Sequence, residues 1–232
     1  GEAFFSFEDK ELRYRNRHLD LITNPSVKSV FESRAKIVKI IRNSLDEKGF
    51  LEVETPVLQP IYGGANARPF TTHHNTLDQK LFLRIASELY LKRLIVGGID
   101  KVYEIGKNFR NEGMDKNHNP EFTMLEFYEA YSDVDDMIIF TEEIFKSISK
   151  KMNKKKVVFN NNEIELTKKF NVIPMKDLFE KYLGVNPIDS ADSEIKKIAK
   201  KHKVDIDKKS GRGKMIEKIF SQLVEPNLIE PT

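Results

Sequence analysis

The chain has 232 residues, of which 39% are apolar and 16 are Phe, so it can build a sizeable core and disorder is not expected. Its 39 Lys and Arg against 36 Asp and Glu leave a net charge of +3, too small to identify a nucleic-acid-binding protein, and the absence of Cys excludes disulfide scaffolds and Cys-ligated zinc. No apolar run approaches the roughly 18 residues that cross a bilayer, and the first residues lack a signal-peptide pattern. We therefore expect a cytoplasmic protein without membrane contact.

The N-terminal part predicts one long helix after a polar segment. Residues 1–25 form a linker segment with a small basic cluster, RYRNRHLD. Asn24 and Pro25 are the residue types of a helix cap and a first turn, and apolar residues follow at helical spacing. Gly49 is typical of a helix end, so we expect the helix to run from Pro25 to just before it.

Extended and helical segments alternate after this helix. FLEVE at 50–54 predicts a short strand, and the polar residues 60–80 predict a loop with short strand pieces. ASELYLKRLIVGG at 86–98 predicts a second helix that ends in glycines. Glu88 follows Ser87 at the start of this helix, where the helix dipole stabilises a carboxylate, so its position alone has a structural explanation.

A pair of strands with many polar residues is the most informative pattern. Residues 102–112 and 121–131 predict two strands joined by the polar loop 113–120. Successive side chains of a strand point to opposite faces, so one face of the pair carries polar groups. The residues that share this face are Glu104, Asn108, Arg110 and Glu112 of the first strand and Phe122, Met124, Glu126 and Tyr128 of the second. A solvent-exposed sheet face is the simplest explanation, and a polar ligand site is the alternative.

The C-terminal part predicts mostly helix. Residues 133–150 have the pattern of an amphipathic helix, and VVFNNNEIEL predicts a hairpin that turns at 160–162. Residues 188–223 are helical and rich in lysine, which indicates a separate helical insertion. SGRGK at 210–214 lacks the full spacing of a phosphate-binding loop and is interpreted as a turn before a helix.

Several segments resemble, in the same order, the motifs of one enzyme family. FRNEG followed by HNPEFTMLEFY resembles motif 2 of class II aminoacyl-tRNA synthetases, a strand, a loop and an antiparallel strand. VFESRAKIVKIIRNSLDEKGFLEVETPVL is similar to their motif 1, a long helix, a strand and a proline, here Pro56. YGGANARPFTTHHN and RIASELYLKRLIVGG resemble lysyl-tRNA synthetases of the bacterial and eukaryotic type, and RYRNRHLDLITNP resembles the segment that follows their anticodon-binding domain. The resemblance covers residues 11–230 and is densest over 50–131.

The resemblance implies an α+β fold, an antiparallel β-sheet flanked by helices, with a helical insertion and a ligand cleft on the face that carries Arg110. The implied organisation is a linker at 1–25, a catalytic core with motifs 1 and 2 at 26–187, the helical insertion at 188–224 and a truncated end at 225–232. The motif 1 helix implies a homodimer. Motif 3, the carboxylates that bind magnesium and the anticodon-binding domain are expected outside this chain.

The resemblance also implies roles for individual residues. Arg110 would be catalytic, because a planar guanidinium can hold both the lysine carboxylate and the α-phosphate of ATP. The other ATP contacts would be Glu112 near the adenine, His118 and Asn119 near the phosphates, and Phe122 stacked on the base. The lysine contacts would be Gly64 and Glu88 at the α-ammonium, Arg110 at the carboxylate, and Glu126 and Tyr128 at the side-chain ammonium. Relatives often have Arg where this chain has Asn117.

The implied activity is that of a lysine--tRNA ligase, which uses ATP with Mg²⁺ to activate L-lysine and transfers it to tRNA(Lys) in protein biosynthesis. No metal ligand is expected in this chain, and without motif 3 the isolated chain is expected to be inactive or weakly active. Three alternatives stay open: a synthetase for aspartate or asparagine, a lysine-transferring paralogue that modifies a translation factor, and a non-catalytic dimerising scaffold. Glu88, Glu126 and Tyr128 suit a cationic side chain and argue against the first.

Overall fold

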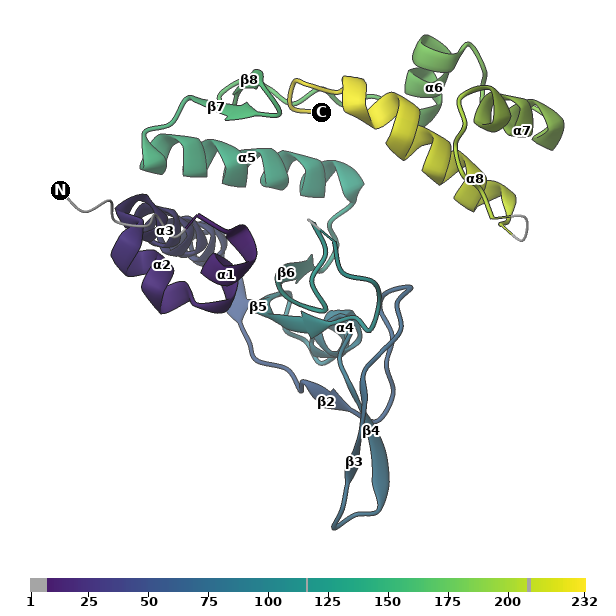
Figure 1. The fold of residues 1–232 in the computed structure, drawn as a ribbon. Coiled ribbons are helices and arrows are strands. Elements are labelled where there is room, and N and C mark those ends of the chain that lie inside the picture. Colours follow the sequence, from purple (N-terminus) through teal and green to yellow (C-terminus); the bar gives the residue numbers. More distant parts are fainter. Residues whose placement is uncertain (1–7, 116, 208–209) are drawn as a thin grey trace. The chain divides into compact units, whose positions relative to one another are not determined.

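The computed structural model describes residues 8–115, 117–207 and 210–232. The chain forms two compact units, Gly1–Ile144 and Phe145–Thr232, which are described separately (Figure 1). Helices accompany small, mostly antiparallel sheets, so the predicted α+β class is confirmed. Within the described ranges, no helix combines the length and the apolar character that crossing a membrane requires.

Three helices open the first unit: α1 (Lys10–Arg15), α2 (Arg17–Thr23) and α3 (Pro25–Glu47). α3 confirms the long predicted helix, and Gly49 just after it has a left-handed φ of 82°. Asn24 is at the predicted cap position, but its side chain donates to Asp20 Oδ1 at 2.9 Å instead. Arg13 and Arg17 also bind this buried carboxylate, which therefore joins α1 and α2 to the start of α3.

The central sheet contains β1 (Leu51–Glu52), β5 (Lys101–Phe109) and β6 (Glu121–Glu129), in the order β1-β5-β6. β5 and β6 are antiparallel as predicted, whereas β1 is parallel to β5, so the sheet is mixed. Glu104 lies directly opposite Glu126, which places both side chains on the same face. α4 (Glu88–Val96) packs against β5 and β6 and ends at Gly97, as the glycines predicted.

The polar face of this sheet differs from its simplest prediction. β5 ends at Phe109, so Arg110 and Glu112 follow the strand instead of belonging to it. A solvent-exposed face is wrong, because polar groups on it are enclosed by other segments of the chain. Glu104 and Asn108 are buried, and Arg110, Phe122, Met124, Glu126 and Tyr128 are half-buried. Buried polar groups need hydrogen-bond partners, so this face is either paired within the protein or left to bind a polar ligand.

The opposite face of the sheet holds an aromatic core. Phe127 alternates with Glu126 along β6 and so points away from it. Its ring meets the edges of Phe50 and of Phe140 at centroid distances of 5.8 and 5.4 Å, and Phe50 stacks on Phe140 at 5.4 Å. Phe140 belongs to α5 (Val134–Met152), the predicted amphipathic helix. The core thus fixes one face of β6 and leaves the other for polar groups.

A second small sheet lies within and beside the predicted loop 60–80. It contains β2 (Leu58–Gln59), β4 (Gln79–Leu83) and β3 (Thr71–His74) in the order β2-β4-β3, all antiparallel. Arg84 follows β4, and its backbone N–H donates to Val57 O at 2.9 Å. The Arg84 carbonyl accepts from Phe109 N at 2.9 Å, which brings the end of β4 beside the residue that precedes Arg110.

The second unit begins within α5 and continues with the hairpin of β7 (Lys156–Phe159) and β8 (Asn162–Glu165). Asn160 and Asn161 form its turn with positive φ, as predicted. Helices α6 (Met175–Leu183), α7 (Asp192–Lys201) and α8 (Arg212–Ile219) follow, then a π-helical turn (Phe220–Val224) and a 3-10 turn (Glu225–Asn227) (Figure 1). Their shared core consists of Leu178, Phe179, Ile195, Ala199, Val204, Met215, Ile219 and Val224. The sequence prediction missed α6, and the predicted insertion boundary at 188 stays a prediction.

Candidate active site

The expected ATP contacts line a pocket of about 290 Å³ at the end of β5 and the start of β6. Its walls are Arg110, Glu112, Gly113, Asn117, His118, Asn119 and Phe122. All five predicted ATP contacts are therefore brought together. Arg110 N donates to Pro120 O at 2.8 Å. This bond joins the two ends of the loop between β5 and β6, where the pocket lies.

Arg110 has the geometry of an anion-binding side chain. Its guanidinium carbon lies 5.0 Å from the centroid of the Phe122 ring, so the ring holds the cation from one side. Its Nε is buried and has no hydrogen-bond partner among the described residues. A buried donor without a partner costs free energy until it is satisfied, so a bound oxyanion is a natural acceptor for it.

Asp115 organises the loop of this pocket, and the sequence analysis did not identify it. Its carboxylate accepts from the backbone N–H groups of Asn117 at 2.7 Å and His118 at 2.9 Å. The His118 ring Nδ1 also lies 2.9 Å from it. The N–H of Asn117 and the His118 ring keep the pKa of Asp115 below its ordinary value. The carboxylate therefore stays ionised at neutral pH and holds His118 in orientation.

The expected lysine contacts form a second group, farther along β6. Glu126 Oε1 accepts from Ser87 N at 3.4 Å, at the start of α4. Glu126 Oε2 is buried and meets no hydrogen-bond partner in the described part of the chain. Burial, followed by the charges of Glu126 and Glu88, raises the pKa of the Tyr128 phenol, which therefore stays protonated at neutral pH. Two carboxylates and a phenol thus gather in one place.

Gly64 and Lys92 complete this second group. Gly64 has a φ of 82°, and an added Cβ would lie 2.8 Å from Glu88 Cβ, so only glycine lets the backbone approach Glu88 this closely. Lys92 was not predicted. Its Nζ lies 2.6 Å from Glu88 Oε1 and 5.8 Å from the centroid of the Tyr128 ring. An ammonium group thus lies beside Glu88 and near the Tyr128 ring.

Magnesium would accompany ATP in the implied reaction. A hard cation of this kind needs several oxygen ligands in a fixed arrangement. Across the described residues, no group of three or more His, Asp or Glu side chains could hold a metal ion. Magnesium that accompanies a nucleotide takes most of its ligands from phosphates and water, so bound ATP would supply them, and no step of the reaction is assigned to the metal.

Comparison with known sequences places this chain in a family. Residues 9–224 match the sequence model of the tRNA synthetases class II (D, K and N). A lysine--tRNA ligase of Thermoanaerobacter sp. strain X514 is 52% identical over 233 residues, which cover 100% of this chain and 47% of the relative. Lysine--tRNA ligases of Pelotomaculum thermopropionicum and Metamycoplasma arthritidis are 49% and 48% identical over 100% of this chain, with 46% and 47% of their own lengths covered. The chain spans about half the length of these relatives.

Proposed function

Because the chain belongs to the class II tRNA synthetases (D, K and N), we propose that it provides the ATP- and lysine-binding face of a lysine--tRNA ligase. The proposed activity is ATP-dependent activation of L-lysine followed by its transfer to tRNA(Lys). One observation carries the choice of lysine: Glu126 Oε2 is buried without a partner within the described ranges, beside Tyr128 and near Glu88. A buried carboxylate oxygen in this state is completed by a cationic ligand.

Lysine has two ammonium groups, and the site offers a carboxylate for each. Glu126 and the Tyr128 oxygen receive the side-chain ammonium, a compact cation with three donors. Glu88 and the backbone at Gly64 receive the α-ammonium, which replaces Lys92 at Glu88 Oε1. An uncharged side chain would leave Glu126 unpaired, so the site selects against it. Aspartate and asparagine carry the α-ammonium but lack the side-chain cation that Glu126 and Tyr128 require.

The chemistry at Arg110 follows from its place in the pocket of the ATP contacts and from its unpartnered guanidinium nitrogen. A lysine carboxylate oxygen attacks the α-phosphorus of ATP, the bond to the β-phosphate oxygen breaks, and pyrophosphate leaves with its electrons. Arg110 holds the lysine carboxylate and the α-phosphate together and stabilises the negative charge of the transition state. Phe122 supports both the guanidinium and the adenine, Glu112 binds near the adenine, and His118 and Asn119 bind the phosphates.

The proposed partners are tRNA(Lys) and a second copy of the chain. Phe145–Thr232 contains 20 Lys and Arg against 12 Asp and Glu, a net charge of +8, which favours contact with a phosphate backbone. α3 supports the homodimer, because its apolar Val30 and Phe31 are exposed at 65% and 45%. A Val30→Glu variant that stays as dimeric as the unsubstituted chain in analytical ultracentrifugation would contradict this interface.

The proposed amino-acid specificity is tested by calorimetric titration of the chain with lysine, aspartate and asparagine. Lysine should bind, and the two others should bind far more weakly, because Glu126 repels the side-chain carboxylate of aspartate and is left without a charge partner by the amide of asparagine. Aspartate binding at least as tightly as lysine would assign the chain to another amino acid of the same family. ATP titrated separately should bind through Arg110, and Arg110→Ala should abolish that binding.

A further inference from the structure

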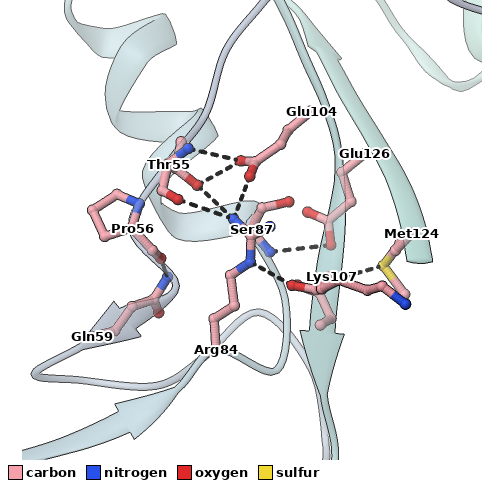
Figure 2. Close-up of polar contacts among 10 residues, drawn as sticks. Thr55, Pro56, Gln59, Arg84, Ser87, Glu104, Lys107, Met124 and Glu126 are labelled. Atoms are coloured by element: carbon pink, nitrogen blue, oxygen red, sulfur yellow. Dashed lines mark hydrogen bonds and ion pairs between the residues drawn. The ribbon is translucent and has the colours of Figure 1, made fainter. Parts of the chain in front are cut away.

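A buried arginine crosses the polar face of the sheet beside the lysine contacts. Arg84 is only 2% exposed, and Figure 2 shows its guanidinium among Thr55, Glu104 and Lys107. Nε donates to Lys107 O at 2.9 Å, and Nη1 donates to Thr55 Oγ1 at 3.1 Å and to Glu104 Oε1. Gly106 makes room for this group, because a Cβ there would lie closer to Arg84 Nη2 than real Cβ contacts allow.

The arginine resolves a conflict between two carboxylates. Glu104 and Glu126 are direct partners in the β5–β6 register, with their side chains on one face. Opposed residues in such a pair have Cβ atoms about 5 Å apart, and like charges there are destabilising. Both carboxylate oxygens of Glu104 have partners within the protein. Arg84 binds Oε1, while Thr55 N and Thr55 Oγ1 donate to Oε2 at 3.2 and 2.6 Å.

Glu126 lies directly opposite Glu104 but has fewer hydrogen-bond partners within the described residues. Its first oxygen accepts the 3.4 Å bond from Ser87 N, drawn in Figure 2, and the Tyr128 phenol also interacts with the carboxylate, but its second oxygen has no partner within the described residues. The two carboxylates are therefore divided into one that the protein neutralises and one that it leaves for a ligand. Sequence alternation gives them equal positions, so the difference is set by Arg84.

We propose that Arg84 is a specificity-determining and positioning residue, which neutralises Glu104 internally so that Glu126 alone receives the side-chain ammonium of lysine. This inference rests on the proposed function. Arg84 also positions the site through its backbone: its carbonyl binds Phe109 N at 2.9 Å, next to Arg110. Without the guanidinium, Glu104 competes with Glu126 for the ligand cation. Without Glu104, the guanidinium turns to Glu126 and excludes the cation.

A double-mutant cycle tests whether Arg84 neutralises Glu104 and so leaves Glu126 for the ligand. The variants are Arg84→Met, Glu104→Gln and the double variant, and the readout is the ratio of lysine to norleucine affinity, because norleucine has the same chain without the side-chain ammonium. Each single variant should lower this ratio at least tenfold, because it leaves a buried charge that acts on the ligand cation. The double variant should restore it to within about threefold. A purely structural role would weaken both ligands in parallel and leave the ratio unchanged, which would overturn the inference.

A second variant covers the case in which Arg84→Met does not fold. Gly106→Ala displaces the guanidinium from Glu104 without removing a charge, and it should lower the same ratio. Gly213→Ala is the matched control, because an added Cβ there meets no described atom within 4 Å. An unchanged ratio in Gly106→Ala would also overturn the inference. If the unsubstituted chain does not prefer lysine to norleucine, the proposed function itself fails, and this inference fails with it.

Discussion

Replacing Glu126 by Gln removes the charge that is proposed to select lysine and keeps the shape of the side chain. Glu126 Oε1 is held by Ser87 N at 3.4 Å, and a Gln oxygen can accept the same bond. The second oxygen, which is buried and has no partner in the described part of the chain, becomes an amide nitrogen. The substitution therefore disturbs the expected ligand contact far more than it disturbs the fold.

The size of the effect follows from the burial of this carboxylate. An ammonium about 4 Å from a carboxylate is attracted by about 4 kcal/mol at an effective dielectric constant of about 20. Truncating one partner of a buried charge pair costs about 2–5 kcal/mol. Since Gln retains an acceptor oxygen, we expect a loss of about 2–3 kcal/mol, or about 30- to 150-fold in lysine affinity. The free energy of unfolding should stay unchanged or rise, because an incompletely paired buried charge is removed.

Calorimetry with lysine and thermal unfolding of the same samples measure the two quantities. Glu121→Gln is the matched control: it lies on the same strand, pairs with Lys107 at 3.2 Å and is about half exposed. Surface pairs of this kind contribute about 0–1 kcal/mol, so lysine affinity should not change in the control. A Glu126→Gln affinity within about threefold of the unsubstituted chain would refute the proposed contact.

Three further outcomes are expected. Phe122→Leu should weaken ATP binding about tenfold in calorimetry, because the ring that supports both the guanidinium and the base is lost. Lysine affinity should fall less, because lysine loses only the support of the Arg110 guanidinium, and equal weakening of both ligands would contradict the pocket assignment. Gly64→Ala should lower the free energy of unfolding in urea by about 1–3 kcal/mol and weaken lysine binding. Gly98→Ala is the control and should leave lysine affinity unchanged, because Gly98 also has a positive φ but no described atom within 4 Å of an added Cβ. Burial and nearby carboxylates raise the pKa of Tyr103 and Tyr128, so the unfolded state releases these protons first and the free energy of unfolding should fall as pH rises above about 10. Phenolate absorbance follows this ionisation, and a Tyr128→Phe variant with the same alkaline loss would show that Tyr128 contributes nothing to it.

Local patterns predicted most of the elements correctly because their causes are local. The 3.6-residue period and the terminal Gly49 specify α3, and the alternation along β5 and β6 specifies the shared face. The missed helix α6 also had local signals: Pro174 precedes it, and Gly184 ends it with a left-handed φ of 68°. Reading these two residues as helix boundaries would have found it.

The division of the polar face could not be predicted from the sequence. Alternation gives Glu104 and Glu126 equivalent positions, and a solvated face satisfies both equally well. The residue that distinguishes them, Arg84, follows a strand of the other sheet, so the distinction depends on long-range packing. Asp115 was missed for a different reason, because its role depends on the backbone conformation of a polar loop.

An NMR titration of the labelled chain tests the central claim, that the side-chain ammonium of lysine binds at Glu126. The Ser87 amide, which donates to this carboxylate, reports on the site directly. Lysine should shift the Ser87 amide and its neighbours on β6, and norleucine at the same concentration should shift them much less. Lysine shifts confined to the separate pocket that Lys48 and Lys101 line, or equal shifts of Ser87 with lysine and norleucine, would contradict the account.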